Sequence, residues 1–500
     1  MSWYGNGVRA WRSLLMVVVV AACHGRSEPS PQPEPGTPAP APGPLSALPP
    51  APPPPVFPES TRSLELVRTV GVRLEPADDA KRIGTVAVDT RVAWSSTRAG
   101  KGCEKPWVEL VPQGWICGDY VKPSTKPPFG QEVPQLDRGE IVPGTYGKVT
   151  AQGAVMYALV KPETKRDKKK PKHGSGAVRS PADLPAPVGD PKLPHMVEAD
   201  PIVGSLNVRQ YEELTVDDKL YWKVAQKDNQ YVLASAISKH QPSHYTGARL
   251  GDDTGLATPI AFVWPRAGML AAWTTAKPAG GGVVHQLVAR TLVPVLETAA
   301  GKDGKPIAYR IGDAEWMAPA DVRVFAAAAP PPTLAPNERW IDVDLDSQIL
   351  VAFEGDVAVY ATMVSSGGKD TPTETGLYRM WLKESEADMK GLNGEDPYSV
   401  ATVPWTQFFS PEKGLALHTA YWHDQFGHAR SHGCVNLAPR DARWLYFWSD
   451  PQVPPGWTMA AGVVESPGSI VRIRSAVDPT PEWKGYAKKV AEARTPATAN

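Results

Sequence analysis

Cys434 and His418 are the residues of this sequence whose types and spacing most clearly indicate chemistry. Cysteine attacks as a thiolate, and its usual pKa of about 8.5 leaves the thiol protonated near neutrality. A neighbouring base must remove that proton, and imidazole suits the task because it titrates near neutral pH. His432 lies so close to the cysteine in the chain that its tether limits its angle of approach. His418 lies further back, and an adjacent strand can aim it at the thiol.

Gly433 directly precedes the cysteine, and glycine lets the backbone approach a ligand closely. The amides of Gly433 and Cys434 are therefore candidates for stabilising an oxyanion. Two simpler interpretations stay open on residue type alone. One is a buried, inert thiol. The other is a structural zinc site. The sequence has no paired Cys-x-x-Cys spacing here, but it offers residues of the types that bind zinc: His418, His423, His428, His432 and Cys434.

The segments that must position these residues are predicted to be mostly β-strands. Apolar runs at 340–345 and 348–353 predict two strands around a turn at Asp346 and Ser347, and 357–364 predicts a third strand. A helix is predicted over 441–448 and a closing strand over 470–473. The polar segment from 476 to 500 is predicted to be a tail, frayed or helical at 482–493.

The motif around the cysteine resembles the signature of the YkuD-type L,D-transpeptidases. In that family a histidine precedes Ser/Thr-His-Gly-Cys-aliphatic-Asn/Arg, and here His418 precedes Ser431-His432-Gly433-Cys434-Val435-Asn436. Upstream, Thr371-Pro372-Thr373-Glu374-Thr375-Gly376 resembles the strand-and-turn phrase of the family, with Glu374 where a second proline is common. The resemblance covers 338–475. It implies a β-sandwich with one or two helices.

The resemblance also implies roles for individual residues. Cys434 is expected to be the nucleophile and His418 the base, with the Thr419 carbonyl orienting the imidazole. The oxyanion site and motif turn are expected to comprise Ser431, His432, Gly433 and Cys434, and Asn436 is expected to position the nucleophile loop or the substrate. Two neighbouring aromatic residues are expected to contact substrate, Tyr421 and Trp422.

The reaction implied by the family is peptidoglycan cross-linking. The thiolate attacks the third residue of a tetrapeptide stem, D-alanine leaves, and a side-chain amine of a second stem resolves the thioester. A wall-attached protein is a further class of acceptor, and water in place of the amine would make the enzyme an L,D-carboxypeptidase or amidase. An NlpC/P60-type peptidase would place its cysteine before the histidine, which is the reverse of the order here. A non-catalytic wall-binding lipoprotein is the main alternative outside enzymes. Thiol acyl transfer needs no cofactor, so we expect neither a cofactor nor a metal.

The N-terminus has the pattern of a bacterial lipoprotein signal peptide over residues 1–22. Arg9 and Arg12 precede a short apolar run that is too short to span a bilayer comfortably. The run ends at Val20-Ala21-Ala22-Cys23, which resembles a lipobox and implies that Cys23 is lipidated. Half of residues 29–58 are proline, so 23–60 is predicted to be a semi-rigid linker. His24 follows the cysteine, which favours the outer membrane and the periplasmic side of the cell envelope.

Three β-rich segments are predicted between the linker and the C-terminal domain, at 64–124, 140–240 and 255–326. The first resembles a bacterial SH3-like domain, and the others resemble it more weakly. All three are therefore predicted to be small SH3-like β-barrel modules that either bind wall peptides or act as spacers. The second carries a basic run at 161–173, expected to be a solvated loop.

Cysteine use and charge limit the compartment and the partners. Cys103 and Cys117 lie in one small segment and are candidates for a disulfide in an oxidising envelope. Lys and Arg total 53, as do Asp and Glu, so the formal net charge is zero. A nucleic-acid partner, which would call for a basic excess, is not expected. The expected partners are peptidoglycan stem peptides and a membrane reached through the lipid anchor.

Overall fold

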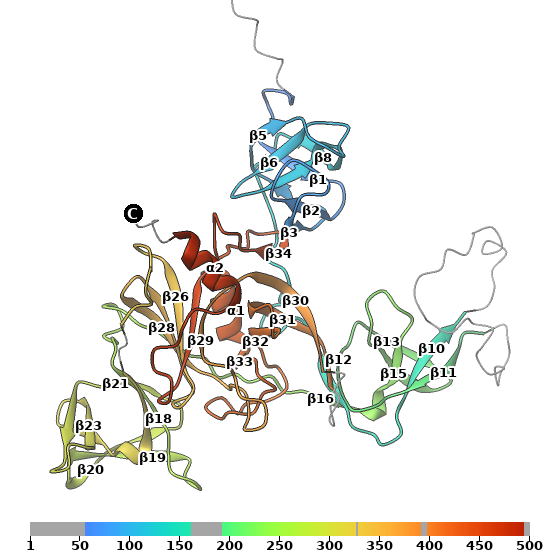
Figure 1. The fold of residues 1–500 in the computed structure, drawn as a ribbon. Helices are drawn as coiled ribbons and strands as arrows, with labels where there is room; N and C mark the ends of the chain where they lie inside the picture. Colours follow the sequence, from blue (N-terminus) through green and yellow to red (C-terminus); the bar gives the residue numbers. More distant parts are fainter. Residues whose placement is uncertain (1–55, 162–192, 327–328, 392–397, 495–500) are drawn as a thin grey trace, which may run out of the picture. The chain divides into compact units, whose positions relative to one another are not determined.

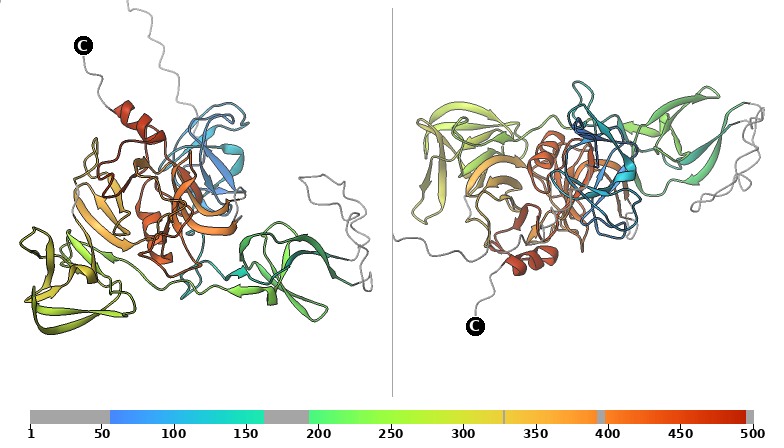
Figure 2. Two further views of the ribbon diagram at one scale, coloured as in Figure 1. Left: turned by 60° about the horizontal axis from the view of Figure 1, so that its bottom comes forward. Right: turned by 90° about the horizontal axis from the view of Figure 1, so that it is seen from above.

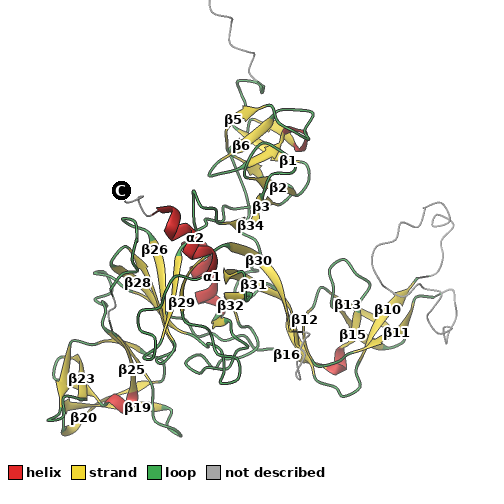
Figure 3. Cartoon of the chain, in the orientation of Figure 1, coloured by secondary structure: helices red, strands yellow, loops and turns green. Residues whose placement is uncertain are grey.

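The computed structural model describes residues 56–161, 193–326, 329–391 and 398–494. Within these ranges strands dominate, and the two α-helices are α1 (Pro439–Trp448) and α2 (Gly485–Arg494) (Figure 3). The prediction of a mostly β protein is confirmed. No helix in the described ranges is long and apolar enough to cross a membrane. The predicted signal peptide, the linker as far as residue 55 and nearly all of the basic run lie outside the described residues.

The C-terminal part contains two β-sheets that enclose a shared apolar core (Figure 1). The first sheet has six strands, in the order β17 (Ala248–Arg249), β28 (Val357–Met363), β27 (Ile349–Glu354), β26 (Arg339–Asp344), β35 (Ile470–Arg474) and β29 (Gly376–Arg379). The second contains β34 (Trp457–Ala461), β30 (Leu382–Gly391), β31 (Tyr398–Ser410), β32 (Leu415–Thr419) and β33 (Val435–Leu437).

The sequence of strand β27 is continuously apolar from Ile349 to Phe353 because both of its faces are buried there. Alternate side chains of a strand point to opposite faces of its sheet. Leu350 and Ala352 belong to the core between the two sheets, whereas Ile349, Val351 and Phe353 pack into a second apolar cluster on the other face. Both faces of the strand are therefore buried, and an apolar residue is needed at each of these positions.

The predicted strands and helix of this part are confirmed within one or two residues. Strands β26 and β27 pair antiparallel from Asp344↔Ile349 outward, around the predicted turn. The predicted helix is α1, which begins at Pro439, where the missing backbone N–H of proline leaves no helical hydrogen bond unmade. The segment predicted as a tail contains α2, whose Ala487 and Val490 are buried beside β29. Figure 2 shows this part of the chain, in orange and red, from two further directions.

The segment nearest the N-terminus has eight strands. They are β1 (Ser63–Leu66), β2 (Val70–Arg73), β3 (Arg82–Val86), β4 (Arg91–Val92), β5 (Trp94–Arg98), β6 (Trp107–Leu110), β7 (Trp115–Cys117) and β8 (Val121–Ser124). Cys103 and Cys117 form a disulfide with an S–S distance of 1.99 Å. Strand β3 pairs with β34, which joins this segment to the second sheet of the C-terminal part.

The next two segments each have apolar clusters of their own. The first has β9 (Tyr146–Val149), β10 (Val155–Val160), β11 (His195–Pro201), β12 (Ser205–Arg209), β13 (Glu212–Val216), β14 (Lys219–Lys223), β15 (Tyr231–Leu233) and β16 (Ile237–Lys239). The second has β18 (Ile260–Val263), β19 (Ala271–Lys277), β20 (Gly280–Val288), β21 (Leu292–Pro294), β22 (Glu297–Ala300), β23 (Pro306–Gly312), β24 (Glu315–Met317) and β25 (Val322–Phe325). The SH3-like assignments and the domain boundaries stay predictions.

Strand β12 joins the segment of β9–β16 to the C-terminal part by direct pairing. It runs parallel to β31, with Ser205 opposite Tyr398 and Asn207 opposite Val400. On its other edge β12 pairs with β9, and β9 pairs with β16. The second sheet of the C-terminal part therefore continues through β12 and β9 to β16.

Candidate active site

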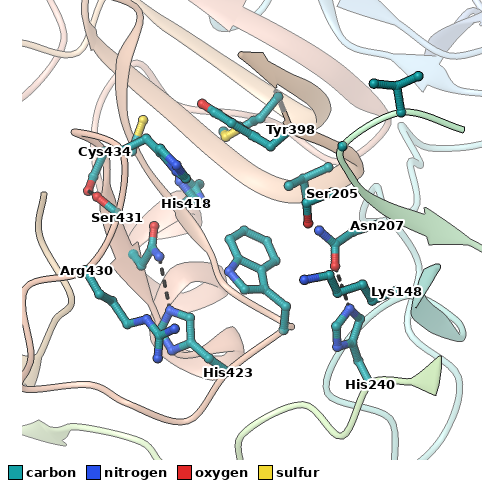
Figure 4. Close-up of a pocket in the computed structure, with 17 residues that line it drawn as sticks. Lys148, Ser205, Asn207, His240, Tyr398, His418, His423, Arg430, Ser431 and Cys434 are labelled. Atoms are coloured by element: carbon teal, nitrogen blue, oxygen red, sulfur yellow. Dashed lines mark hydrogen bonds between the residues drawn. The ribbon is translucent and has the colours of Figure 1, made fainter. Parts of the chain in front are cut away.

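The parallel pairing of β32 with β33 brings the predicted nucleophile and base together. Cys434 is the residue immediately before β33, and the register places His418 opposite Asn436. Cys434 and Asn436 are alternate residues, so their side chains leave the same face of the sheet as that of His418. Figure 4 shows the His418 ring and the Cys434 thiol at the same end of one cavity.

His418 is held as a neutral base. Its side chain is 2% exposed, and its Nδ1 lies 2.9 Å from the Thr419 carbonyl oxygen. A carbonyl only accepts, so Nδ1 carries the proton and Nε2 is left as the acceptor. Burial lowers the pKa of His418 to about 4, against the smaller opposing effect of the Thr419 carbonyl. At neutral pH the imidazole is therefore free to take a proton.

Cys434 is held as a thiol. Its side chain is part-exposed, and Sγ lies 3.8 Å from the carbonyl oxygen of Gly414. Loss of solvent raises the pKa of the thiol to about 11, and the backbone of Ala416 offsets part of that rise. Since the thiol is protonated at neutral pH, the arrangement suits proton transfer to His418 during attack rather than a preformed thiolate.

Ser431 closes the turn that carries the cysteine. Its hydroxyl donates to the carbonyl oxygen of Cys434 and accepts from the Gly433 amide at 3.1 Å. Gly433 has φ of +122°, a conformation that favours glycine. The Thr373 hydroxyl donates to the Gly433 carbonyl oxygen at 2.7 Å, so the upstream Thr-Pro-Thr phrase braces the turn.

The Gly433 amide, which the sequence predicted as an oxyanion donor, donates to the Ser431 hydroxyl in this structure. The amide of Cys434 is the remaining member of that predicted pair. His432, also predicted at this position, lines the cavity and stacks on Tyr398 with ring centroids 4.4 Å apart.

Asn436 and His423 form a second polar pair in the cavity. The Asn436 amide lies 3.1 Å from Nε2 of His423, and Nδ1 of the same ring accepts a hydrogen bond from the Gln425 backbone amide, also at 3.1 Å. Burial, and then the charge of Arg430, lower the pKa of His423 to about 4, so the ring is neutral and has one acceptor nitrogen, Nδ1, and one N–H, on Nε2. His423 was considered from sequence only as a zinc ligand, because its contact with Asn436 has no local sequence signal.

The two residues predicted to contact substrate have different environments. Trp422 lines the cavity. Tyr421 is fully buried, stacks on Tyr146 at 4.0 Å and donates to the Ala401 carbonyl oxygen at 2.9 Å. The prediction that Tyr421 contacts substrate is wrong, because its ring packs into the joint with β9 instead of facing the cavity.

The cavity has a volume of about 810 Å³ and two walls. One wall carries Cys434, His418 and the other motif residues. The other comes from the segment of β9–β16, which the sequence predicts only to be a wall-binding module or a spacer. This second wall contributes Lys148, Val203, Gly204, Ser205, Asn207 and His240.

The described residues contain one close group of three metal-ligand types, formed by Cys103, Cys117 and Asp119. The sulfur atoms of its two cysteines are joined to each other in the disulfide, so this group does not have two free thiolates for a metal.

Comparison with known proteins supports the interpretation of the motif. Residues 338–473 match the family model YkuD, described as the L,D-transpeptidase catalytic domain. This C-terminal region is therefore a YkuD-type domain. No curated protein matches the chain.

Solved structures of L,D-transpeptidases resemble parts of the chain. A mutant enzyme from Enterococcus faecium is 25% identical over 30% of this chain and 55% of its own, with a TM-score of 0.23. An enzyme from Mycobacterium smegmatis is 16% identical over 48% of this chain and 89% of its own, with a TM-score of 0.23. One from Stackebrandtia nassauensis is 26% identical over 28% of this chain and 57% of its own, with a TM-score of 0.20.

The chain thus spans about half the length of the Enterococcus enzyme. Because all three TM-scores are low, these likenesses carry no conclusion about the chain as a whole. The assignment of the YkuD-type domain rests on residues 338–473.

Proposed function

We propose that the chain is a peptidoglycan L,D-transpeptidase that works through a thioester on Cys434. The single observation that carries the proposal is the register of β32 and β33, which brings a neutral His418 to the side of the Cys434 thiol. The match of residues 338–473 to the YkuD family supports the substrate class.

In the proposed first step, Nε2 of His418 takes the thiol proton while Sγ of Cys434 attacks the carbonyl carbon of the third residue of a tetrapeptide stem. The amide of Cys434 donates to the developing oxyanion. The C–N bond to D-alanine breaks, and the proton held by His418 passes to the leaving amine. A thioester remains on Cys434.

In the second step, the side-chain amine of another stem attacks the thioester. His418 takes a proton from that amine, the C–S bond breaks, and the proton returns to the sulfur. The product is a cross-link between two stems, and the enzyme regains its thiol. A wall-attached protein that carries an amine is an alternative acceptor, and water would give carboxypeptidase or amidase activity.

The deciding experiment is mass spectrometry of purified tetrapeptide muropeptides incubated with the full-length chain and with its Cys434→Ala variant. Dimers that have lost one D-alanine, absent with the variant, are the expected result. Tripeptides without dimers would make the protein a hydrolase. The absence of any Cys434-dependent product would favour a wall-binding lipoprotein without catalysis.

We also propose that Cys23 anchors the chain to the outer membrane, facing the periplasm, because its sequence context matches a lipobox followed by His24. Mass spectrometry of the mature N-terminus tests this: a diacylglyceryl group on Cys23 is expected, and a free thiol there would contradict it. Membrane fractionation of wild type and Cys23→Ala locates the chain.

A further inference from the structure

The second wall of the cavity is one face of a continuous sheet. Ser205 and Asn207 are alternate residues of β12, so they share a face, and Lys148 lies opposite Asn207 on β9. Across the other edge of β12, Ser205 lies opposite Tyr398 and Asn207 opposite Val400. All five side chains line the cavity that contains Cys434.

Side-chain contacts hold this wall against the YkuD-type domain. Arg209, at the end of β12, forms an ion pair with Glu386 of β30. Tyr146, at the start of β9, stacks on Tyr421. Together with the pairing of β12 and β31, these contacts join the second wall of the cavity to the YkuD-type domain.

A hydrogen bond between the Tyr211 and Thr402 hydroxyls, 3.0 Å long, also joins the wall to the YkuD-type domain. Most of these partners are buried or part-buried, so the joint is packed as well as hydrogen-bonded.

Among the described residues that line the cavity, the charged side chains are those of Lys148 and Arg430, and none belongs to Asp or Glu. Lys148 is exposed, and it forms no ion pair with any residue in the described part of the chain. Figure 4 shows its amine on the side of the cavity opposite Cys434 and Ser431. An exposed cation that has no acidic side chain among the described lining residues favours a bound anion.

His240, near Lys148, is neutral and hydrogen-bonded to Asn207. Burial, followed by the charge of Lys148, lowers the pKa of His240 to about 4, so the ring is uncharged near neutrality. Its Nε2 donates to Oδ1 of Asn207 over 2.7 Å. With Oδ1 engaged, the amide nitrogen of Asn207 is left as a donor on the same face as Lys148.

We propose that Lys148 is a specificity-determining residue that binds a carboxylate of the peptide substrate, with the Asn207 amide as a second donor. This inference deepens the proposed function and rests on it for the class of substrate. Stem peptides carry a carboxylate on the terminal D-alanine of the donor and others along both stems. Lys148 would bind a carboxylate whichever of these groups it meets, and the experiment below distinguishes the terminal D-alanine carboxylate from the other carboxylates of the stems.

The test compares the full-length chain with Lys148→Gln, Lys148→Arg and Lys219→Gln. Lys219 is a matched control, since it is an exposed lysine on β14 of the same segment that does not line the cavity. The substrates are a tetrapeptide stem, the same stem amidated at its terminal carboxylate, and a stem amidated at its remaining carboxylates. Binding is measured by calorimetry in a Cys434→Ala background, and kcat/KM is measured with Cys434 intact.

Lys148→Gln is expected to weaken binding of the free stem about tenfold, which is the usual scale for one charge-assisted contact at a part-exposed site. Lys148→Arg should retain most of the affinity, and Lys219→Gln should leave it unchanged. The stem whose amidation abolishes the difference between wild type and Lys148→Gln identifies the carboxylate that is bound. An effect on transfer to the acceptor but not on acylation of Cys434 would assign it to the acceptor stem.

The inference and the proposed function fail separately. Equal affinity of wild type and Lys148→Gln for every stem overturns the inference, even if cross-linking by Cys434 is observed. Binding that depends on Lys148, without any Cys434-dependent product, removes the proposed catalysis and supports the carboxylate site. An equal loss for free and fully amidated stems would also overturn the inference, because the loss would then not concern charge.

Discussion

At the scale of single residues, burial moves the pKa values of the proposed nucleophile and the proposed base apart. The pKa of Cys434 rises to about 11 and that of His418 falls to about 4. Over the wide range between these values the resting pair is a neutral thiol and a neutral imidazole. A proton must therefore move for the thiol to react, and the reactivity of the free enzyme should follow pH.

Alkylation of Cys434 by iodoacetamide is expected to rise about tenfold per pH unit between pH 7 and 9, since only the thiolate reacts. Mass spectrometry of the peptide that contains Cys434 measures the rate. His418→Gln should keep the same slope, while its turnover falls by roughly 10²–10⁴-fold through loss of the base. A plateau in alkylation near or below pH 7 would contradict this and would indicate a preformed thiolate–imidazolium pair.

Ser431→Ala is expected to lower the free energy of unfolding by about 1–2 kcal/mol, because both hydrogen bonds of its hydroxyl are lost. Turnover should fall as well, since the turn that aims Cys434 loses its brace. Urea unfolding and muropeptide kinetics measure the two effects. Ser431→Thr keeps the hydroxyl and is the control; a Thr variant as impaired as the Ala variant would mean that the hydroxyl is not what matters.

At the scale of elements, the sequence predicted several strands of the YkuD-type domain and the proposed catalytic pair, but not the second wall of the cavity. The apolar runs of β26 and β27 and the Ser-His-Gly-Cys motif are local signals, and they identified the strands and the candidate pair. Strand β30 was not predicted, and it contains Lys383, Glu384 and Glu386. Lys383 is nevertheless fully buried. Its amine donates to the carbonyl oxygens of Tyr446 and Ser449, at the end of α1, and such a long-range partner leaves no sequence pattern.

The misplacement of Tyr421 has the same cause. Its neighbour Trp422 faces the cavity, and the two were predicted together because they follow His418. Tyr421 is turned away by Tyr146, which comes from the segment of β9–β16. Pairing between distant strands decides which face each residue occupies, and a single sequence does not reveal that pairing.

The ion pair between Arg209 of β12 and Glu386 of β30 is expected to contribute to stability. Burial raises the pKa of Glu386, and the charge of Arg209 opposes that rise. Arg209→Met removes the counter-charge from a carboxylate that is about one-quarter exposed, at 27%. We expect the free energy of unfolding at pH 7 to fall by about 1–3 kcal/mol, measured by urea denaturation.

The double variant Arg209→Met, Glu386→Leu should recover most of that loss, because no unpaired charge is then left. Hydrogen exchange of the β12 amides should follow the same order of variants. If the single and double variants are equally destabilised, the ion pair is not what matters at this joint.

At the scale of the whole molecule, the stability of the folded unit should depend on the histidines that line the cavity. A histidine whose folded pKa is depressed is neutral in the folded chain but protonated in the unfolded chain between pH 6.5 and about 4. Acidification through this range therefore favours unfolding. Buried carboxyls such as Asp441, whose pKa is raised by burial, act in the opposite direction, so a comparison of variants is needed.

His240→Gln removes one such titration and keeps an amide that can donate to Asn207. The loss of unfolding free energy between pH 7 and pH 5 should then be smaller than in wild type by about 1 kcal/mol, after allowance for partial solvent access. Urea denaturation at the two pH values measures this difference. Identical pH dependence in both proteins would show that His240 titrates normally in the folded chain.

The parallel pairing of β12 with β31 also bears on the order in which the molecule assembles. Arg209 and Glu386, which lie at this joint, are 177 positions apart in the chain. During synthesis from the N-terminus, β9, β12 and β16 leave the ribosome long before their partner strand β31. One edge of their sheet then waits unpaired until β31 arrives, and an unpaired edge is a site for pairing with the wrong chain. Cys434 is made later than β9, β12 and β31, so a chain interrupted before Cys434 lacks both the cysteine and strand β33 of the sheet.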